Sequence, residues 1–239
     1  MTSKQLEEFN KIQQDIRHKV VLKNEFSYIK YVGGLDISFK KDDSNIACAY
    51  LTILNIDSLD VVYECYELTM LTVPYISGYL GLREIGPYIS LLRKVRKDKP
   101  EFYPDVLMID GNGILHGARA GVASHIGVIE NIPTIGVSKT LLCIDGLNEI
   151  EVKERFKKEC LKKGDYITLI GNDDEILGVA LKTSNDAINP RFVSIGTKID
   201  LSSCIDIVNK MSVYINPEPI RLSDIRSKLH FDENITANS

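Results

Sequence analysis

The chain has 239 residues, of which 44% are hydrophobic and 26% charged, and its formal net charge is −4. That size suits one α/β domain over residues 1–239, and the apolar runs are shorter than the ~18 residues that a membrane span needs, so we expect no membrane contact. The charged N-terminus lacks a signal-peptide core, so we expect an intracellular protein. The five cysteines are dispersed, so we expect neither disulfides nor a zinc site. The acidic balance disfavours a long phosphate-binding surface, so we expect a compact site.

The first third of the chain is expected to form a helix followed by three strands. Apolar residues recur at helical spacing and predict an amphipathic N-terminal helix over residues 1–24, at Leu6, Phe9, Ile12, Ile16 and Val20. Runs rich in Val, Ile, Tyr and Thr follow at 31–39, 46–54 and 59–71. Because the turns between them are short and polar, an antiparallel meander is expected.

The pattern then changes to alternating strands and helices. Helices are expected at 84–97 and 121–130, and short apolar strands buried on both sides at 105–110 and 134–139. This alternation predicts parallel crossovers. Further elements follow as a helix at 149–163, strands at 166–171, 175–183 and 192–195, a helix at 204–215 and a frayed tail at 229–239. The fold class is therefore α/β, with a mixed central sheet flanked by helices.

Three acidic residues lie where an uncompensated charge is costly. Asp36 is inside the apolar strand GGLDISF, Asp110 ends the strand DVLMID, and Glu84 begins a predicted helix. Each could cap a turn, pair with Lys or Arg, or face water. Alternatively they converge on a divalent cation, which resolves the repulsion between clustered carboxylates. A first strand and the carboxyl end of an adjacent parallel strand can bring Asp36 beside Asp110, and oxygen ligands suit Mg²⁺ or Mn²⁺.

Five segments in order resemble the endonuclease V family. They are PYISGYLGLRE at 74–84, PDVLMIDGNGILH at 104–116, GVASHIGV at 121–128, PTIGVSK at 133–139 and INPEPIRLSD at 215–224. The resemblance implies a ribonuclease-H-like fold and a Mg²⁺-dependent endonuclease, with Mn²⁺ able to substitute. It further implies that the enzyme recognises a deaminated purine, inosine above all, in RNA or DNA. Cleavage is expected at the second phosphodiester bond on the 3′ side, leaving 3′-hydroxyl and 5′-phosphate.

The resemblance also implies roles for single residues. Asp36, Glu84 and Asp110 would bind the metal, Asp224 would be a fourth acidic position, and Lys139 would be the active-site lysine. Tyr75 would be the tip of a wedge that holds strands apart. The pocket for the flipped base would be lined by Gly78, Leu80, Gly111, Asn112, Gly113, His116 and Gly121. Glycines suit such a pocket because backbone groups can then approach the base and distinguish hypoxanthine from adenine. His125 has no assigned role.

Several positions depart from the family pattern. Ser77 replaces a proline in the wedge, and Gly117-Ala118-Arg119 stands where Pro-Arg-Gly is usual, so the role of the arginine is open. Thr197 replaces a histidine, which suggests altered hydrogen bonding around the metal ligands. Ser138 and Thr140 flank Lys139 in place of the commoner Ala and Lys. Since every carboxylate is retained, an active enzyme is expected.

Two other functions stay open from the sequence. One is a ribonuclease-H-like nuclease with the same carboxylates and no base specificity, and the other is a protein that binds inosine-containing nucleic acid without cutting it. The chain is expected to act as a monomer. Its acidity favours a small single-stranded footprint, and RNA only slightly over DNA. A basic run can be a solvated helix face or a phosphate-docking surface, and comprises Arg93, Lys94, Arg96, Lys97 and Lys99.

Overall fold

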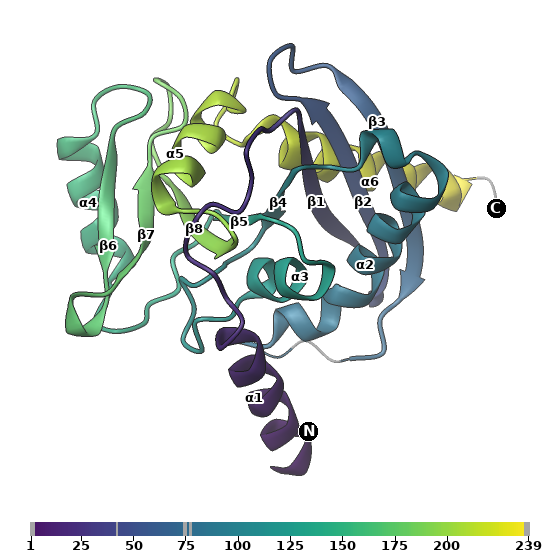
Figure 1. The fold of residues 1–239 in the computed structure, drawn as a ribbon, viewed down its shortest axis with the longest axis horizontal. Coiled ribbons are helices and arrows are strands. Elements are labelled where there is room, and N and C mark those ends of the chain that lie inside the picture. Colours follow the sequence, from purple (N-terminus) through teal and green to yellow (C-terminus); the bar gives the residue numbers. More distant parts are fainter. Residues whose placement is uncertain (1–2, 42, 74–75, 77, 237–239) are drawn as a thin grey trace.

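The computed structural model describes residues 3–41, 43–73, 76 and 78–236 (Figure 1). Its centre is one eight-stranded sheet in the order β3-β2-β1-β4-β5-β8-β7-β6. The strands are β1 (Tyr31–Lys40), β2 (Asp43–Asn55), β3 (Val61–Met70), β4 (Val106–Asp110), β5 (Thr134–Ser138), β6 (Tyr166–Ile170), β7 (Ile176–Leu181) and β8 (Arg191–Thr197). The first three form an antiparallel meander, whereas β4 and β5 run parallel to β1. The mixed sheet predicted from the sequence is confirmed.

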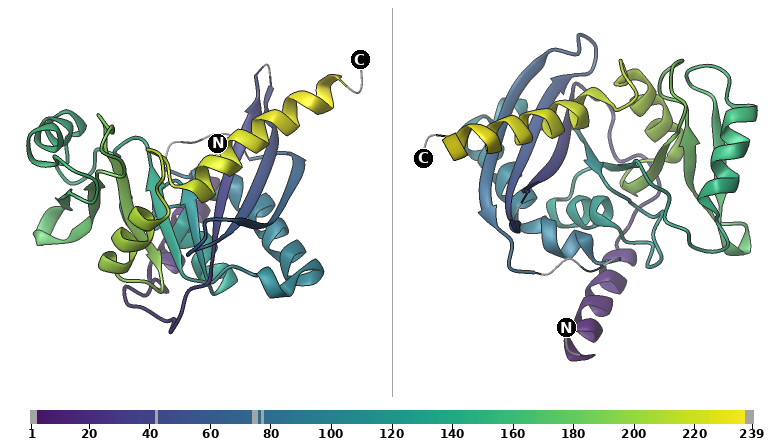
Figure 2. Two further views of the ribbon diagram at one scale, coloured as in Figure 1. Left: turned by 90° about the horizontal axis from the view of Figure 1, so that it is seen from above. Right: turned by 180° about the vertical axis from the view of Figure 1, so that it is seen from behind.

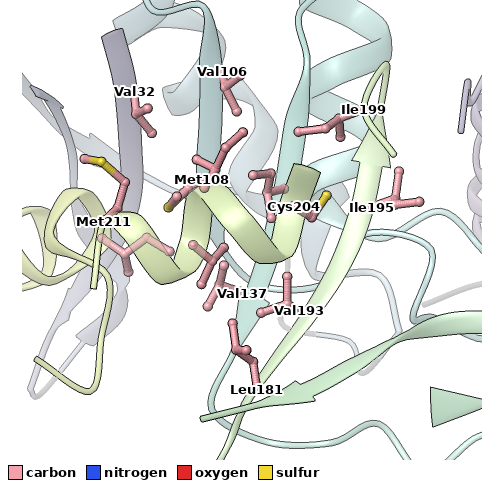
Figure 3. Packing of buried hydrophobic residues seen from close by; sticks show 14 of the residues in the cluster. Val32, Val106, Met108, Val137, Leu181, Val193, Ile195, Ile199, Cys204 and Met211 are labelled. Atoms are coloured by element: carbon pink, nitrogen blue, oxygen red, sulfur yellow. The ribbon is translucent and has the colours of Figure 1, made fainter. Parts of the chain in front are cut away.

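Helices cover both faces of the sheet. On one face, α2 (Leu80–Asp98) and α3 (Val122–Glu130) pack on a core that includes Leu35, Leu107 and Ile109. On the other face lie α5 (Leu201–Lys210) and α6 (Glu218–Thr236), and α6 runs across β1 and β2 (Figure 2). The side chains of Met108 and Val137 point towards α5 (Figure 3). Helix α4 (Glu149–Glu159) packs on β6, and two short 3-10 turns, η1 (Pro100–Phe102) and η2 (Asn172–Asp174), complete the elements.

Helix α6 is fixed directly against the backbone of β1. A Cβ atom on Gly34 would lie 2.1 Å from the carbonyl carbon of Pro219, so glycine permits this close approach. The hydroxyl of Ser223 donates to the backbone oxygen of Gly34 at 2.8 Å, and the Ser38 and Ser227 hydroxyls lie 2.6 Å apart. Because Ser223 and Ser227 are one helical turn apart, they fix which residues of α6 face the strand.

Two terminal predictions were wrong. Helix α1 (Ser3–Arg17) ends well before residue 24, because the following segment instead forms backbone hydrogen bonds beside the end of β8: Lys198 donates to Val21 at 2.6 Å and Glu25 donates to Lys198 at 3.1 Å. The tail is not frayed from residue 229, since α6 continues to Thr236. Pro219 is tolerated in its first turn, and no later proline or glycine interrupts it.

All five cysteines are free thiols, as expected. None of the helices in the described ranges is long and apolar enough to cross a membrane. Helix α1 projects from the body of the molecule, with its C-terminal turns against the loop that precedes α2 (Figure 1).

Candidate active site

Asp36 and Asp110 lie on adjacent parallel strands at matching positions. Leu35 of β1 pairs with Ile109 of β4, and the two aspartates are the next residues along each strand. In parallel strands, residues that follow a register pair point to the same face, and neighbouring strands are ~4.8 Å apart. The two carboxylates therefore lie side by side, which is the arrangement that the apolar strand patterns predict.

Glu84 reaches the same site from the second turn of α2. Its side chain is buried and accepts a hydrogen bond from Tyr88. Burial, followed by the charge of Asp110, raises the pKa of Glu84 to about 8, while Arg83 and Tyr88 oppose the shift. Burial and the charges of Asp110 and Asp224 likewise raise the pKa of Asp36 well above its usual range. The protein thus holds these carboxylates where their negative charge is poorly compensated.

Lys139 and Asp224 complete the charged cluster. The Nζ atom of Lys139 lies 2.8 Å from Oδ2 of Asp110. Although burial alone would lower the pKa of Lys139, the nearby carboxylates, Asp110 foremost, raise it above its usual value. Asp224 comes from α6, where its neighbour Ser223 is anchored to β1, and its Oδ1 atom lies 2.7 Å from Nζ of Lys228. The structure therefore brings together all five residues singled out from the sequence.

The donor set fits a hard divalent cation. Asp36, Glu84 and Asp110 offer carboxylate oxygens, and the raised pKa values of the first two show a charge that a cation would relieve. In the part of the chain that the structure describes, no three His, Cys, Asp or Glu side chains yet converge as a finished metal cage. Asp110 instead contacts Lys139, so a metal ion bound by Asp110 would have to replace or share this contact.

A small pocket adjoins the acidic cluster. Its volume is about 110 Å³, far below the ~300–1,000 Å³ of drug-sized sites, so it suits a small planar group such as one base. It is lined by Gln13, Gly78, Leu80, Gly81, Gly111, Asn112, His116, Ala120, Gly121, Val122 and Leu142. Six of the seven residues expected around the base are among them. Gly113 lies behind the pocket, where its amide donates to Ser194 Oγ at 2.9 Å.

Backbone geometry explains two of the pocket glycines. Gly78 has φ of +82°, which favours glycine, although a Cβ there would meet no atom within 4 Å. At Gly121 the cause is space, because a Cβ would lie 2.2 Å from the carbonyl oxygen of Asn112. The hydroxyl of Ser138 lies 3.1 Å from Oδ1 of Asn112, so the residue before Lys139 helps to position the pocket loop.

Sequence reasoning missed the contribution of α1. The Nε2 atom of Gln13 donates to the backbone oxygen of Gly78 at 2.6 Å, and the hydroxyl of Tyr79 donates to Asn10 at 2.6 Å. Phe9 also packs against the Tyr79 ring, with centroids 5.7 Å apart. Gln13 is buried on the same helical stripe as Phe9 and Ile16. A polar residue on an otherwise apolar stripe was the signal that could have revealed it.

The departures from the family pattern have different structural outcomes. Arg119 forms ion pairs with Asp145 and with Glu175, the latter at 2.8 Å, so it fastens the pocket loop to the region before β7. The suggestion for Thr197 was wrong: it pairs with Thr134 at the start of β5, whereas Lys139 follows the end of that strand. Its hydroxyl accepts a hydrogen bond from the amide of Val21 at 2.9 Å, so it secures the N-terminal segment instead. Tyr75 and Ser77 lie outside the described residues.

Two other sequence features lie apart from the carboxylates. Arg93 and Arg96 of the basic run form ion pairs with Glu130 of α3, at 3.8 and 3.4 Å, so part of their charge is compensated within the fold. His125 is buried in α3, and burial, together with the nearby His116, lowers its pKa to about 4. His125 is therefore neutral near pH 7.

Comparison with known proteins decides the family. The family model described as Endonuclease V matches residues 14–225. The chain belongs to the Endonuclease V family. Human Endonuclease V is 37% identical over 210 residues, which are 88% of this chain and 74% of the human protein. Endonuclease V from Dictyoglomus turgidum is 37% identical over 230 residues, which are 96% of this chain and 92% of the bacterial protein.

Solved structures of Endonuclease V share the fold. The catalytic domain of human Endonuclease V gives a TM-score of 0.96 at 33% identity and covers 99% of both chains. Endonuclease V from Ciona intestinalis, in complex with a 24mer DNA containing an inosine followed by a ribo-adenosine, gives 0.92 at 34% identity, over 97% of this chain and 99% of that one. As an Endonuclease V, the chain is a hydrolase that acts as a nucleic-acid endonuclease.

Proposed function

We propose that this Endonuclease V recognises inosine in RNA or DNA and, with a divalent metal ion, hydrolyses the second phosphodiester bond on its 3′ side. The products are a 3′-hydroxyl and a 5′-phosphate. One observation carries the proposal: the acidic cluster and the small pocket share a segment, because Gly111 and Asn112 line the pocket directly after Asp110. A base held in the pocket therefore brings its own backbone to the carboxylates.

Asp36, Glu84 and Asp110 would hold Mg²⁺ or Mn²⁺. When bound, such an ion neutralises charge on the scissile phosphate and makes a water molecule more acidic. Lys139 lies at the edge of this cluster, where its ammonium group can donate a hydrogen bond to a phosphate oxygen or orient the attacking water. Asp224, on the α6 side, can orient that water or accept a proton from it.

The pocket favours a purine read by its edge. Burial lowers the pKa of His116, although a hydrogen bond to the backbone of Gly78 opposes this change. A neutral imidazole therefore lines the pocket near pH 7. Gly78, Gly111 and Gly121 line the pocket without side chains, which leaves room for a ring to enter. Hypoxanthine has a carbonyl and a ring N–H where adenine has an amino group and a bare nitrogen. Main-chain donors and acceptors can discriminate these once the base has left the stack.

The form of the nucleic acid is also a proposal. The Ciona intestinalis enzyme was crystallised on DNA with one inosine, which supports a nucleic-acid strand as the partner. The net charge of −4 favours a short single-stranded footprint, and RNA slightly over DNA. We propose Tyr75 as the wedge residue on the family resemblance. Since one chain supplies both the carboxylates and the pocket, a monomer would suffice.

A cleavage assay tests the proposal. Single-stranded RNA and DNA, each with one inosine or with adenosine at the same position, are incubated with Mg²⁺ or with EDTA. We expect that only the inosine strands are cut, and only in Mg²⁺. The 5′-phosphate should lie on the second nucleotide 3′ of the inosine. Glu154→Gln, which removes a negative charge from the exposed face of α4, is the matched control for substitutions in the cluster.

The alternatives give other outcomes in the same assay. Equal cutting of inosine and adenosine strands would identify a nuclease without base specificity. Retention of inosine strands without cutting, in both Mg²⁺ and Mn²⁺, would identify a binding protein.

A further inference from the structure

An arginine continues the line of active-site charges across the sheet. The strands β1, β4, β5 and β8 are successive neighbours. Asp36 lies on β1, Asp110 ends β4, and Lys139 directly follows β5. Ser138 pairs with Phe192 of antiparallel β8, so the next positions outward are Lys139 and Arg191. Two carboxylates, an ammonium group and a guanidinium group thus follow one another along a single edge.

The register also places Arg191 on the same face as the acidic cluster. Met108, Val137 and Val193 all point towards α5 and belong to one buried cluster (Figure 3). Side chains alternate along a strand, so residues two positions away share that face. Asp110 is two residues after Met108, and Arg191 is two residues before Val193. The carboxylate of Asp110 is close enough to oppose the lowering of the Arg191 pKa by burial.

The charge of Arg191 has neutral partners within the described residues. Its Nε atom donates to Oδ1 of Asn216 at 2.5 Å, and its Nη1 atom donates to the backbone oxygen of Pro190 at 3.2 Å. By contrast, Arg119 and Arg221 each form an ion pair with a carboxylate. Because a partly buried cation whose hydrogen-bond partners are neutral is costly, it is a favourable place for an anion to bind.

An open groove lies beside Arg191. Its volume is about 440 Å³, and Tyr214, Asn216 and Arg221 line it together with Arg191, Ser184, Ile215 and one carboxylate, that of Asp186. A second cavity of about 200 Å³ also contains Arg191 in its wall and extends the groove. The Tyr214 side chain is 58% exposed, and the Arg221 guanidinium lies 4.7 Å from the centre of its ring. Exposed aromatic rings beside arginines are the features on which single-stranded bases stack.

We propose that Arg191 binds a backbone phosphate on the 3′ side of the bond that is cut, and that the groove along Tyr214 receives the nucleotides that follow. This inference rests on the proposed function, which sets the polarity. The pocket loop continues into α3 on the opposite face of the sheet from Arg191. A strand whose base occupies the pocket passes Asp110 and Lys139 before it reaches Arg191, about two strand spacings or ~10 Å from Asp110.

Neutralising one phosphate at a time tests the contact with Arg191. A set of inosine strands is prepared, each with one uncharged methylphosphonate at a different linkage on the 3′ side. Their binding in Mg²⁺ is measured for two proteins, Asp110→Asn and Asp110→Asn with Arg191→Gln. We expect one linkage at which neutralisation weakens binding roughly tenfold when arginine is present and has no further effect in Arg191→Gln. The slope of log K against log salt should also fall by about 0.7. Arg191→Lys should restore part of that slope.

Arg155→Gln is the matched control, because it removes the same charge from the exposed face of α4, where Arg155 pairs with Glu159. It should leave the linkage pattern unchanged, and melting temperatures of all variants report whether the fold is intact. The assignment is overturned if, at every linkage, the methylphosphonate weakens binding to the Arg191→Gln protein as much as it weakens binding to the protein that keeps Arg191. If the protein that keeps Arg191 bound inosine and adenosine strands equally well, the proposed function itself would be refuted.

Strand length tests the groove. Tyr214→Ala should weaken binding of strands that extend past the cut by about tenfold and leave strands that end at the cut unaffected. Tyr28→Ala, at a tyrosine that is also exposed but precedes β1, is the control and should affect neither strand. Equal weakening of both lengths by Tyr214→Ala would overturn the groove assignment.

Discussion

The ammonium group of Lys139 lies 2.8 Å from Oδ2 of Asp110, across the boundary between β5 and β4. Asp110 is also the neighbouring charge that most raises the pKa of Asp36 and of Glu84, after burial. Lys139, together with Lys228 at Asp224, therefore offsets only part of the negative charge that four carboxylates bring from β1, α2, β4 and α6. The remaining charge stays uncompensated by the protein and is the physical reason to expect a cation at this site.

Asp110→Asn should separate binding from cleavage. The substitution removes the charge that recruits a cation but keeps the shape of the side chain and the pocket backbone at Gly111. We expect cleavage of inosine strands to fall by at least ~10²-fold while binding changes by less than about threefold. Single-turnover cleavage and filter binding measure the two effects. Cutting at a near wild-type rate would contradict the role of Asp110, and Glu154→Gln should behave as wild type.

Glu84→Gln should stabilise the metal-free protein at alkaline pH. The folded-state pKa of Glu84, about 8, is above the ordinary value of 4.5, so the folded state binds the extra proton. Its stabilising effect is fully present below pH 4.5 and is lost as pH rises through about 8. Complete loss corresponds to several kcal/mol, an upper limit. In EDTA, the two proteins should melt similarly near pH 5, and Glu84→Gln should melt higher near pH 9.

Added Mg²⁺ provides the control for this pH dependence. A cation bound at the carboxylates stabilises their charged form, so Mg²⁺ should raise the melting temperature of the wild type more at pH 9 than at pH 5. It should raise that of Glu84→Gln less. Parallel melting curves for both proteins across the pH range in EDTA would show that Glu84 ionises normally.

The acidic cluster was predictable because its members interrupt strong local patterns. Asp110 ends a continuous apolar run, and Asp36 lies within another, so both strands and both charges can be read from the chain. Parallel alternation of strands and helices then brings β1 beside β4. The identity of the pocket residues, by contrast, came from family resemblance, since nothing in the spacing of Gly78 and Gly111 indicates a common cavity.

Contacts between distant segments were not predictable. Gln13 reaches Gly78 across 65 residues, and the hydroxyl of Thr197 accepts from Val21 across 176. Neither contact follows from helical or strand periodicity, because both depend on where a loop ends after the sheet has formed. Likewise, the residues around Pro219 have no clear apolar period, and packing of Gly34 against that helix start fixes α6 instead.

Arg119→Ala should loosen the pocket loop. Arg119 is largely buried and pairs with Asp145 and Glu175, and its loss leaves Asp145 without a partner. We expect a loss of about 2–3 kcal/mol in the free energy of unfolding, less than for a fully buried pair because Glu175 is 42% exposed. The ratio of inosine to adenosine cleavage should fall as well. In a double-mutant cycle with Asp145→Ala, the two losses should not add; additive losses would show that the pair is not coupled.

Gly113→Ala and Gly86→Ala should have opposite effects on stability. A Cβ at Gly113 would lie 2.0 Å from the carbonyl oxygen of Ile195, an atom of β8 that the sheet holds in place. The substitution must displace the pocket loop, and we expect a loss of at least ~2 kcal/mol in the free energy of unfolding with weaker inosine binding. At Gly86, within α2, a Cβ would meet no atom within 4 Å, so alanine should stabilise the helix by roughly 0.5–1 kcal/mol. Urea unfolding measures both, and a Gly113→Ala protein as stable as the wild type would contradict the close packing of this loop on β8.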